Sequence, residues 1–235
     1  MLTVPVLAYH QVAPYRGPSP DRPGLVVHRT SFHRQLLLLR ILGYRTITLD
    51  QLIKALEGGP ALPRRAVALT FDDGYRGTYE WAFPLLLRYG FIATFFLIAE
   101  DFAIERNAMS KRAYSVLDSP QVREMISAGM QIGSHSVSHP RLCDLTPAQG
   151  YAEIVDSKAL LECAFGQSID AFCYPYGQYH ARLVSLVEAA GYSCAVTTQF
   201  GQRHRVQDRF ALKRIPVGAA QGLAQFAYRL LRDRE

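Results

Sequence analysis

The sequence predicts an α/β fold in which parallel strands close into a barrel. Short apolar runs rich in β-branched and aromatic residues alternate with amphipathic stretches of helical period. This alternation is typical of a parallel sheet whose strands are joined by helical crossovers. With 235 residues and seven or eight predicted strands, a closed barrel fits better than an open sheet. No repeat or interdomain linker divides the chain, so we expect a single domain over residues 1–235.

The N-terminal half predicts four strands and three helices. Gly43 and Gly90 follow two helical stretches, where glycine favours the left-handed conformation that ends a helix. Thr30 or Ser31 can cap the first helix, and Asp50 can cap the second. The predicted strands are Val4–Tyr9, Arg45–Thr48, Ala66–Phe71 and Ile92–Ile98, and the first and third helices are Ser31–Leu42 and Tyr79–Tyr89.

The C-terminal half continues the alternation. Ser119-Pro120 and Thr146-Pro147 start helices, because proline suits the first helical turn. Gly129 ends the first of these helices, and the second reaches about Ala164. The remaining helices are His180–Ala190 and Leu223–Arg232, and the strands are Met130–Gly133, Ala171–Tyr174, Ser193–Thr197 and Leu212–Pro216. The two longest loops are Ala13–Val27 and Glu100–Asp118, and loops of this length are often functional.

Composition excludes several classes of protein. The chain is 49% hydrophobic and 20% charged, which argues against disorder. Its net charge of +6 is spread without a dense basic block or a nucleic-acid-binding motif, so we expect no nucleic-acid partner. No apolar run approaches the roughly 18–20 residues of a membrane span, so none is expected.

The N-terminus and the cysteines carry weaker signals. Residues 1–7 lack a positive segment and a long apolar segment, so the sequence as it stands predicts a cytoplasmic protein. Export remains the alternative if a leader lies outside these residues. Cys143, Cys163, Cys173 and Cys194 form no C-x-x-C pair, which argues against a zinc knuckle and leaves free thiols or disulfides open.

Two adjacent carboxylates, Asp72 and Asp73, follow the predicted strand Ala66–Phe71 and precede Gly74. Neighbouring carboxylates repel, and burying even one is unfavourable without a cation or a hydrogen-bond donor. At the end of a strand, one can face a metal ion and the other a water molecule. The alternative is a helix cap beside a surface acid.

A pair of histidines follows another predicted strand. His135 and His139 are four residues apart, and Pro140 disfavours a helix at His139, so we expect a turn-like loop. Two histidines and one carboxylate can bind a metal ion and leave a position open for water. Either histidine alone could be structural. Because parallel barrels build their sites at the carboxyl ends of strands, their occurrence with Asp72 and Asp73 predicts a metal centre.

Two further segments end strands. In Phe172–Gly177, Pro175 and Gly177 favour an irregular turn that can leave a backbone N–H pointing into the site, as a tetrahedral intermediate needs. His10 follows the first strand, where it could transfer protons or be structural. The aromatic residues near these strand ends, Tyr75, Trp81, Tyr174 and Tyr176, could stack on sugar rings, although core packing is the better interpretation for Trp81.

These motifs resemble a known family. Thr70–Gly74 is similar to the T-F-D-D-G motif of the carbohydrate-esterase family 4, or NodB-homology, polysaccharide deacetylases. His135–His139 resembles the H-[S/T]-x-x-H motif of that family, and Phe172–Gly177 resembles its third motif. The opening Val4–His10 resembles the subgroup that de-N-acetylates poly-β-1,6-N-acetylglucosamine. The resemblance extends from about Val4 to Val217.

The resemblance implies a deformed (β/α) barrel of about seven parallel strands and a divalent metal, zinc first, with cobalt or nickel also accepted. By motif position, Asp73, His135 and His139 would be the ligands. Asp72 would be the general base, and the backbone N–H of Tyr176 would complete the oxyanion hole.

The chain departs from the family pattern at two positions. Cys173 stands where the third motif commonly carries an arginine that holds the base, and the late Leu-x-His motif that supplies a general acid is absent from Leu212–Val217. We expect Arg214 to replace the missing arginine beside Asp72 and His10 to supply the acid.

The predicted activity is metal-dependent hydrolysis of the acetamide of N-acetylated amino sugars in an oligo- or polysaccharide, which releases acetate. One alternative is a metal-dependent amidase on a small or carrier-linked amide. Another is a catalytically silent carbohydrate-binding barrel, against which the complete set of Asp72, Asp73, His135 and His139 argues. The sugar, its linkage and the oligomeric state are left open by the sequence.

Overall fold

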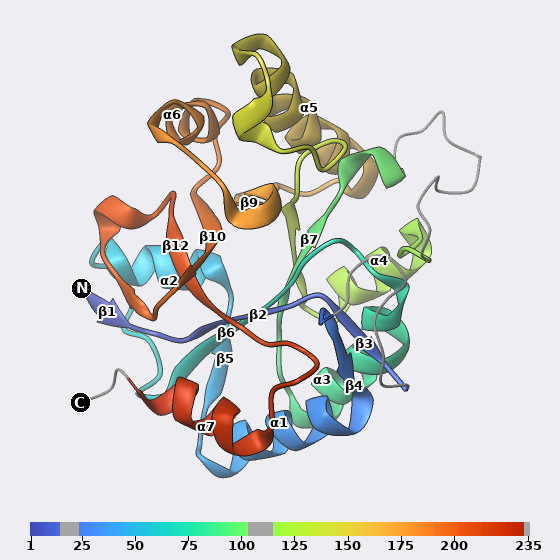
Figure 1. The fold of residues 1–235 in the computed structure, drawn as a ribbon, viewed down its shortest axis with the longest axis vertical. Coiled ribbons are helices and arrows are strands. Elements are labelled where there is room, and N and C mark those ends of the chain that lie inside the picture. The colour runs from blue at the N-terminus through green and yellow to red at the C-terminus, as the bar shows by residue number, and fades with distance from the viewer. Residues whose placement is uncertain (15–23, 103–114, 233–235) are drawn as a thin grey trace.

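Seven parallel strands close into a barrel in the computed structural model, which describes residues 1–14, 24–102 and 115–232 (Figure 1). Around the ring the strands follow the order β2-β12-β10-β9-β8-β7-β6, and pairing of β6 with β2 completes the circle. β5 (Arg45–Ile47) pairs with the first half of β6 beside the ring. The ring strands are β2 (Val6–Tyr9), β6 (Ala66–Phe71), β7 (Thr94–Leu97), β8 (Gln131–Ser134), β9 (Ala171–Cys173), β10 (Cys194–Phe200) and β12 (Leu212–Pro216). The predicted parallel barrel is therefore confirmed.

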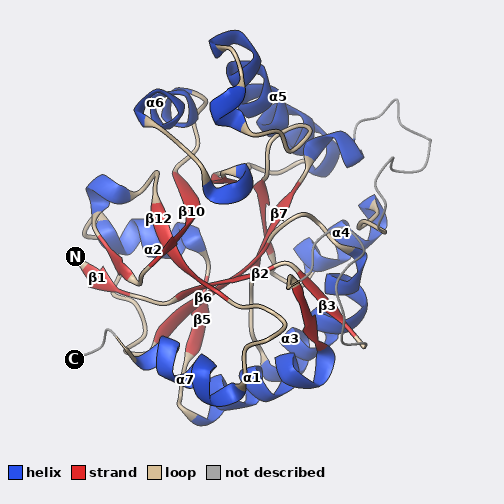
Figure 2. Ribbon diagram, viewed as in Figure 1, coloured by secondary structure: helices blue, strands red, loops and turns tan. Residues whose placement is uncertain are grey.

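Helices surround the strands, as Figure 2 shows. Helices α5 and α6 lie at the upper edge of this view, and α1 and α7 lie together at the lower edge. The α-helices are α1 (Arg29–Ile41), α2 (Leu49–Leu56), α3 (Phe83–Tyr89), α4 (Ser119–Ser127), α5 (Pro147–Phe165), α6 (Ala181–Ala189) and α7 (Leu223–Leu231). None of the helices in the described residues combines the length and apolarity that crossing a membrane requires.

The barrel wall separates two hydrophobic clusters, because successive side chains of a strand point to opposite faces. In β6, Val67, Leu69 and Phe71 pack outward with the helices, whereas Ala66 and Ala68 belong to the inner cluster. Small side chains face inward where space is short. Gly133 of β8 is another example, because a Cβ there would lie 2.6 Å from the ring of Phe96.

The same alternation carries polar residues to the mouth of the barrel. Thr70 and Asp72 continue the inward-facing series of Ala66 and Ala68. His10 lies four residues after Val6, an inner-cluster residue of β2, and so faces the same side of the chain. Arg214 lies two residues after Leu212 of β12 and shares its inward face. Side chains that are distant in sequence therefore meet above the inner cluster.

The helix starts differ from the predicted caps. His28 caps α1 by accepting a hydrogen bond from the Thr30 backbone, where Thr30 or Ser31 was expected. Thr48, with Gln51, forms a capping box at the start of α2, so the expected Asp50 cap is wrong. Thr48 accepts from the backbone three residues later, which is the geometry of a cap, and Asp50 lies inside the first turn instead.

The predicted helix Tyr79–Tyr89 is not continuous. The chain forms a π-helical turn over Thr78–Ala82 and then α3, which has Pro84 at its start. Proline in the interior of one long α-helix would remove a backbone hydrogen bond and clash with the preceding turn. Starting α3 at Phe83 places this proline in the first turn, where it is tolerated.

Two small pairings were not predicted. β1 (Leu2–Thr3) pairs antiparallel with β11 (Arg203–His204), and β3 (Gln11–Ala13) pairs with β4 (Val26–His28). The second pairing occupies both ends of the expected loop Ala13–Val27. Residues 15–23 of that loop, and residues 103–114 of the expected loop Glu100–Asp118, lie outside the described residues.

Candidate metal centre and active site

Three of the predicted ligands converge above the barrel. Nε2 of His135 lies 3.4 Å from Oδ1 of Asp73, and Nε2 of His139 lies 3.3 Å from the same oxygen. All three side chains are buried, and their ligand atoms lie within 4.8 Å of one another. Burial raises the pKa of Asp73, but hydrogen bonds from His135 and His139 and the charges of His135 and His10 outweigh it and hold that pKa well below its usual value.

The chemistry of these donors fits a divalent metal ion. Nδ1 of His135 donates to the Cys173 carbonyl at 2.7 Å, because a carbonyl oxygen can only accept, and in the neutral ring this leaves the lone pair on Nε2. Burial lowers the pKa of His135, but Cys173 and the hydrogen bond to Asp73 raise it well above its usual value, so without a cation Nε2 carries a proton that it donates to Asp73. A bound cation would take the place of that proton. Two tetrahedral zinc ligands, each about 2.0–2.1 Å from the ion, are about 3.3–3.4 Å apart, which matches both distances.

The loop that carries the two histidines is held by helix α5. The Glu153 carboxylate accepts hydrogen bonds from the backbone N–H groups of Val137 and Ser138, at 2.8 and 2.9 Å. It also accepts from the Ser138 hydroxyl at 2.6 Å. Within the loop, the His139 N–H donates to the Ser136 hydroxyl oxygen. These contacts fix the turn-like loop that the sequence predicts.

Asp72 lies beside the triad and is paired with Arg214. The guanidinium donates to both carboxylate oxygens of Asp72, at 2.8 and 2.7 Å, and both side chains are buried. Burial raises the pKa of Asp72, but the charge and hydrogen bonds of Arg214 outweigh it and hold the pKa below its usual value. The expected placement of Arg214 against Asp72 is therefore observed.

His10 completes this side of the site. Its Nε2 lies 3.8 Å from Oδ2 of Asp72, and the side chain is partly exposed. Burial lowers the pKa of His10, and the charges of Asp72 and Asp73 only partly offset that effect. A proton held at this position can reach a group bound in the mouth of the barrel.

Tyr176 lies on the other side of the candidate metal ligands. Its ring meets the His139 ring edge-on, with centroids 4.8 Å apart, and the Arg141 guanidinium lies 4.6 Å from the Tyr176 ring centroid. The turn Pro175–Gly177 bends sharply, because Tyr176 has a φ of 60°. The expected irregular turn is present. Gly177 is required next to it, since a Cβ there would lie 2.1 Å from the Thr198 hydroxyl.

Left-handed backbone conformations mark the site. Among the described residues, the non-glycine residues with positive φ are Asp73, Ser136, His139 and Tyr176. Non-glycine residues seldom adopt this conformation, and it concentrates at functional sites that the surrounding structure holds in place. Two of the four are predicted metal ligands, and the other two lie in the loops that carry the site.

Two of the aromatic residues proposed to stack on sugars cannot do so. Tyr75 and Tyr174 are fully buried, and the Tyr174 hydroxyl donates to the Phe210 carbonyl inside the protein. Trp81 packs against the outer core with the Arg29 guanidinium over its ring, so its expected packing role is confirmed. Tyr176 is 41% exposed and keeps a ring that a ligand can reach.

Cys173 occupies the position of the expected family arginine. Its thiol accepts a hydrogen bond at 3.3 Å from Arg214, and this guanidinium from β12 binds Asp72 in the way that was expected of the missing arginine. Cys173 also lies near Asp72 and His135, but Asp72 already binds Arg214, and burial raises the pKa of the thiol. The four cysteines are free thiols.

Sequence reasoning missed the supporting residues. Glu153, Thr70 and Thr197 were not identified, although Thr70 accepts from Arg214 and the Thr197 carbonyl accepts from its Nε. For Glu153 a signal existed. It lies beside the buried positions Gly150 and Ile154 of α5, where a carboxylate requires hydrogen-bond donors.

Comparisons with known proteins identify related sequences and structures. The family model described as Polysaccharide deacetylase matches residues 59–195. YxkH of Bacillus subtilis (strain 168), a protein assigned to the polysaccharide deacetylases, is 32% identical over 223 residues, which are 95% of this chain and 74% of YxkH. A poly-β-1,6-N-acetyl-D-glucosamine N-deacetylase of Staphylococcus epidermidis is 25% identical over 195 residues, 79% of this chain and 66% of that protein.

A solved structure shares the whole fold. The deacetylase PplD of Streptococcus pyogenes, determined in complex with acetate, superposes with a TM-score of 0.86 at 26% identity and covers 97% of this chain and 98% of its own. The matched region contains the Asp72-Asp73 pair and both histidines. The chain therefore belongs to the polysaccharide deacetylase family of hydrolases, which act on acetamide C–N bonds.

Proposed function

We propose that this protein is a metal-dependent de-N-acetylase that removes acetate from N-acetylated amino sugars of an oligo- or polysaccharide. The observation that best supports this proposal is the convergence of His135 and His139 on one oxygen of Asp73. Directly beside them lies Asp72, which Arg214 keeps ionised. Zinc is the proposed ion, because an Asp-His-His donor set suits it, and cobalt or nickel can occupy the same ligands.

The ligand roles follow from the donor set. Asp73, His135 and His139 would hold the ion, and the Cys173 carbonyl keeps the Nε2 lone pair of His135 available for it. When bound, such an ion polarises a carbonyl oxygen and makes water nucleophilic at neutral pH.

The remaining roles belong to residues of the chain. Asp72 accepts the proton of the attacking water, and Arg214 orients Asp72 and keeps it ionised until then. The Tyr176 backbone N–H donates to the oxyanion that develops on the acetyl carbonyl. His10 protonates the departing nitrogen as the C–N bond breaks. One water and one acetamide become acetate and a free amino sugar.

The relatives suggest which glycan to test first. The Staphylococcus epidermidis relative carries a name that specifies poly-β-1,6-N-acetyl-D-glucosamine. The exposed Tyr176 ring beside the His139 ligand supplies a surface on which one sugar ring of such a polymer can stack. We propose β-1,6-linked N-acetylglucosamine oligomers as the substrate class.

The test is acetate release from β-1,6- and β-1,4-linked N-acetylglucosamine oligomers and from the monomer. Each assay is run with the purified chain, after chelation, and after return of Zn²⁺, Co²⁺ or Ni²⁺. The proposal is supported if a chelator abolishes acetate release and added metal restores it. The oligomer that is hydrolysed fastest then identifies the preferred linkage. Release that survives complete removal of metal contradicts metal dependence. Metal binding without release from any glycan would favour a small or carrier-linked amide as substrate.

A further inference from the structure

Helices α1 and α7 present an outward face with an unusual composition. Of the ten large hydrophobic residues that are exposed in the described part of the chain, five lie on these two helices, with exposed fractions between 41% and 71%. We call this surface the α1–α7 face. It comprises Arg34, Leu37, Arg40 and Ile41 of α1 and Leu223, Tyr228, Arg229 and Leu231 of α7.

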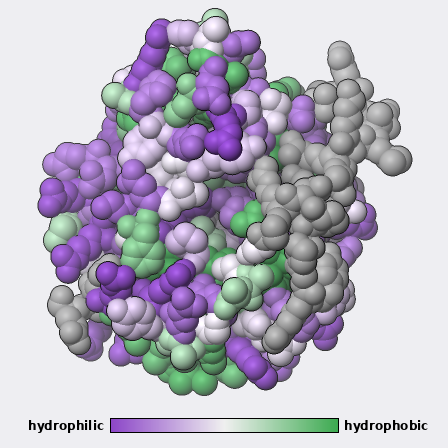
Figure 3. Space-filling model, viewed as in Figure 1, coloured by the Kyte–Doolittle hydropathy of each residue, from purple (hydrophilic) through white to green (hydrophobic). Residues whose placement is uncertain are grey.

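These residues form one surface because the two helices pack side by side. Phe32, Leu36 and Leu39 of α1 and Phe226 and Leu230 of α7 are buried in the same outer core cluster. The residues on the opposite side of each helix therefore point away from the barrel. Figure 3 shows hydrophobic surface gathered along the lower edge, where Figure 1 places α1 and α7.

The charged side chains of the α1–α7 face are all positive. Neither α1 nor α7 contains an aspartate or a glutamate, and both contain arginine. Among the described residues, no carboxylate forms an ion pair with Arg34 or Arg40, and Arg229 donates to the Pro216 carbonyl and so keeps its charge. The face therefore combines aliphatic and aromatic side chains with positive charge that nothing in the described structure neutralises.

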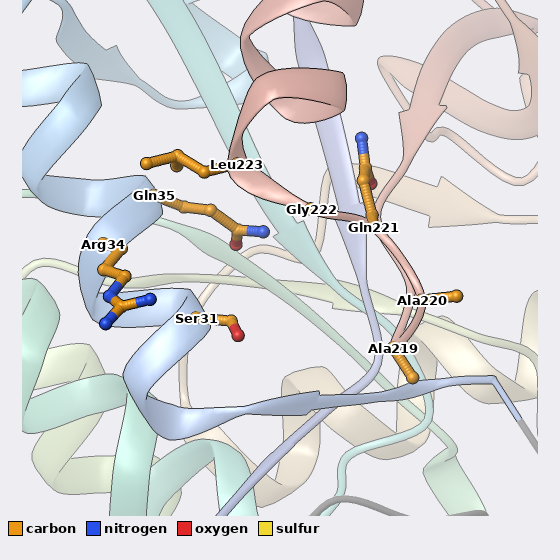
Figure 4. A pocket seen from close by; sticks show the side chains of 8 residues that line it. All are labelled: Ser31, Arg34, Gln35, Ala219, Ala220, Gln221, Gly222 and Leu223. Carbon is orange, nitrogen blue, oxygen red and sulfur yellow. The ribbon is translucent and has the colours of Figure 1, made fainter.

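A small polar pocket opens where the first turns of α1 and α7 meet (Figure 4). It has a volume of about 210 Å³, and Arg34 and Leu223 of the α1–α7 face help to line it. Ser31, Gln35 and Gln221 supply its polar groups. The amide nitrogen and oxygen of Gln221 are buried and have no hydrogen-bond partner within the described part of the chain.

We propose that the α1–α7 face binds the surface of a membrane that contains anionic lipids. Apolar side chains flanked by arginine are the composition that places a helix at the headgroup boundary, where the apolar groups enter the acyl region and the guanidinium groups contact phosphates. Arg34 also lines the pocket, so a headgroup that enters it lies beside a guanidinium group. A second copy of this chain fits less well, because a symmetric contact would bring the arginines of both copies together.

This proposal does not depend on the hydrolytic activity. Binding at the α1–α7 face would keep the enzyme at a surface rather than alter its chemistry. We therefore expect variants of this face to release acetate from short oligomers at the rate of the unaltered protein.

The experiment is cosedimentation of the full chain with vesicles of phosphatidylcholine, with and without phosphatidylglycerol. We expect binding only to the anionic vesicles and weaker binding at high salt. One arginine near an anionic surface contributes about 1 kcal/mol, or about fivefold in partitioning, so the double variant Arg34→Gln/Arg40→Gln should bind about thirtyfold more weakly. The variant Leu37→Ser/Ile41→Ser should also lose binding to anionic vesicles.

Matched controls lie on the opposite edge of the barrel. Tyr151 on α5 and Arg182 on α6 are exposed, so Tyr151→Ser/Arg182→Gln removes the same kinds of side chain and should bind vesicles normally. Circular dichroism verifies that each variant is folded. Failure of the unaltered chain to bind anionic vesicles would overturn the proposal, as would equal loss of binding in the control variant. A dimer in light scattering that the α1–α7 variants disrupt would instead assign this face to self-association.

Discussion

Adjacent residues at the end of β6 have different surroundings because their side chains leave the chain on different sides. The side chain of Asp72 faces inward, like every second side chain of the strand, and contacts Arg214. Asp73 adopts a left-handed conformation with φ 70°, which lies outside the strand geometry and faces its carboxylate toward His135 and His139. Two carboxylates that would repel each other in isolation are thus each paired with cationic or donor groups.

This division predicts different effects for two substitutions. Asp72→Asn should retain bound metal but lose about 10²–10⁴-fold in kcat, because an amide cannot accept the proton of water. His135→Ala should lose both metal and activity, because it removes a ligand. Metal content measured on the purified variants, together with acetate release, separates the two. Substantial activity in folded Asp72→Asn would overturn the role of Asp72 as general base.

At the scale of elements, helix α5 supports the loop that follows β8. Three hydrogen bonds to the carboxylate of Glu153 fix Val137 and Ser138, which lie between the two candidate ligand histidines. Glutamine at position 153 is neutral, so its hydrogen bonds with Val137 and Ser138 lose the strength that the carboxylate charge supplies.

We expect Glu153→Gln to weaken metal binding by about 10–100-fold, as is typical when a group that orients metal ligands is lost. Competition with a chromophoric chelator measures the affinity. The matched control is Asp156→Asn, which removes an exposed carboxylate from the same helix. Equal affinities of both variants would show that Glu153 does not position the ligands.

The pairing of β1 with β11 contains a buried histidine. His204 is 1% exposed, and its Nε2 donates to the Val4 carbonyl at 3.0 Å. Burial lowers the pKa of His204, although the hydrogen bond to Val4 acts in the opposite direction. The folded protein therefore binds fewer protons here than the unfolded chain does as pH falls.

The free energy of unfolding should consequently decrease as pH falls below about 6.5, the ordinary histidine pKa of the unfolded chain. His204→Gln keeps a donor for the Val4 carbonyl but does not titrate, so its stability should fall less steeply over the same range. Urea denaturation at several pH values between neutral and mildly acidic measures both slopes. Identical slopes would show that His204 does not contribute to acid sensitivity.

At the scale of the whole molecule, Arg214 connects four strands. From β12 it donates to the Thr197 carbonyl of β10, the Cys173 thiol of β9, and Thr70 of β6 and Asp72 directly after β6. The side chain is fully buried. The hydrogen bonds that hold Asp72 therefore also tie together the mouth of the barrel.

Removing only one partner of this buried pair should be strongly destabilising. Arg214→Met leaves the Asp72 carboxylate buried without its cation, and we expect a loss of about 3–5 kcal/mol in the free energy of unfolding. The double variant Arg214→Met/Asp72→Asn should be more stable than Arg214→Met, because it removes both charges. Guanidinium denaturation of the two variants measures the coupling. A double variant that is less stable than Arg214→Met would contradict a stabilising charge pair.

The sequence alone determined the fold class and most element positions, and it predicted which residues would bind a metal ion. Hydrophobic periodicity and glycine or proline at element ends are local properties, so they are readable without the fold. The caps of α1 and α2 and the interruption before α3 were missed because several residues compete for each position. The motifs around Asp72, Asp73, His135 and His139 were readable because their polar residues follow apolar strands.

Only the tertiary structure decided how these residues meet. The ring order of the strands brings β12 between β2 and β10, so Arg214 reaches Asp72 from 142 positions away in the chain. The tertiary fold also buries Tyr75 and Tyr174 and leaves Tyr176 accessible. It places α1 beside α7, and their outward side chains form one basic, apolar face. A sequence pattern shows which face of a helix or strand a residue occupies. Which other elements pack against that face depends on how the barrel closes, and closure results from many weak long-range contacts.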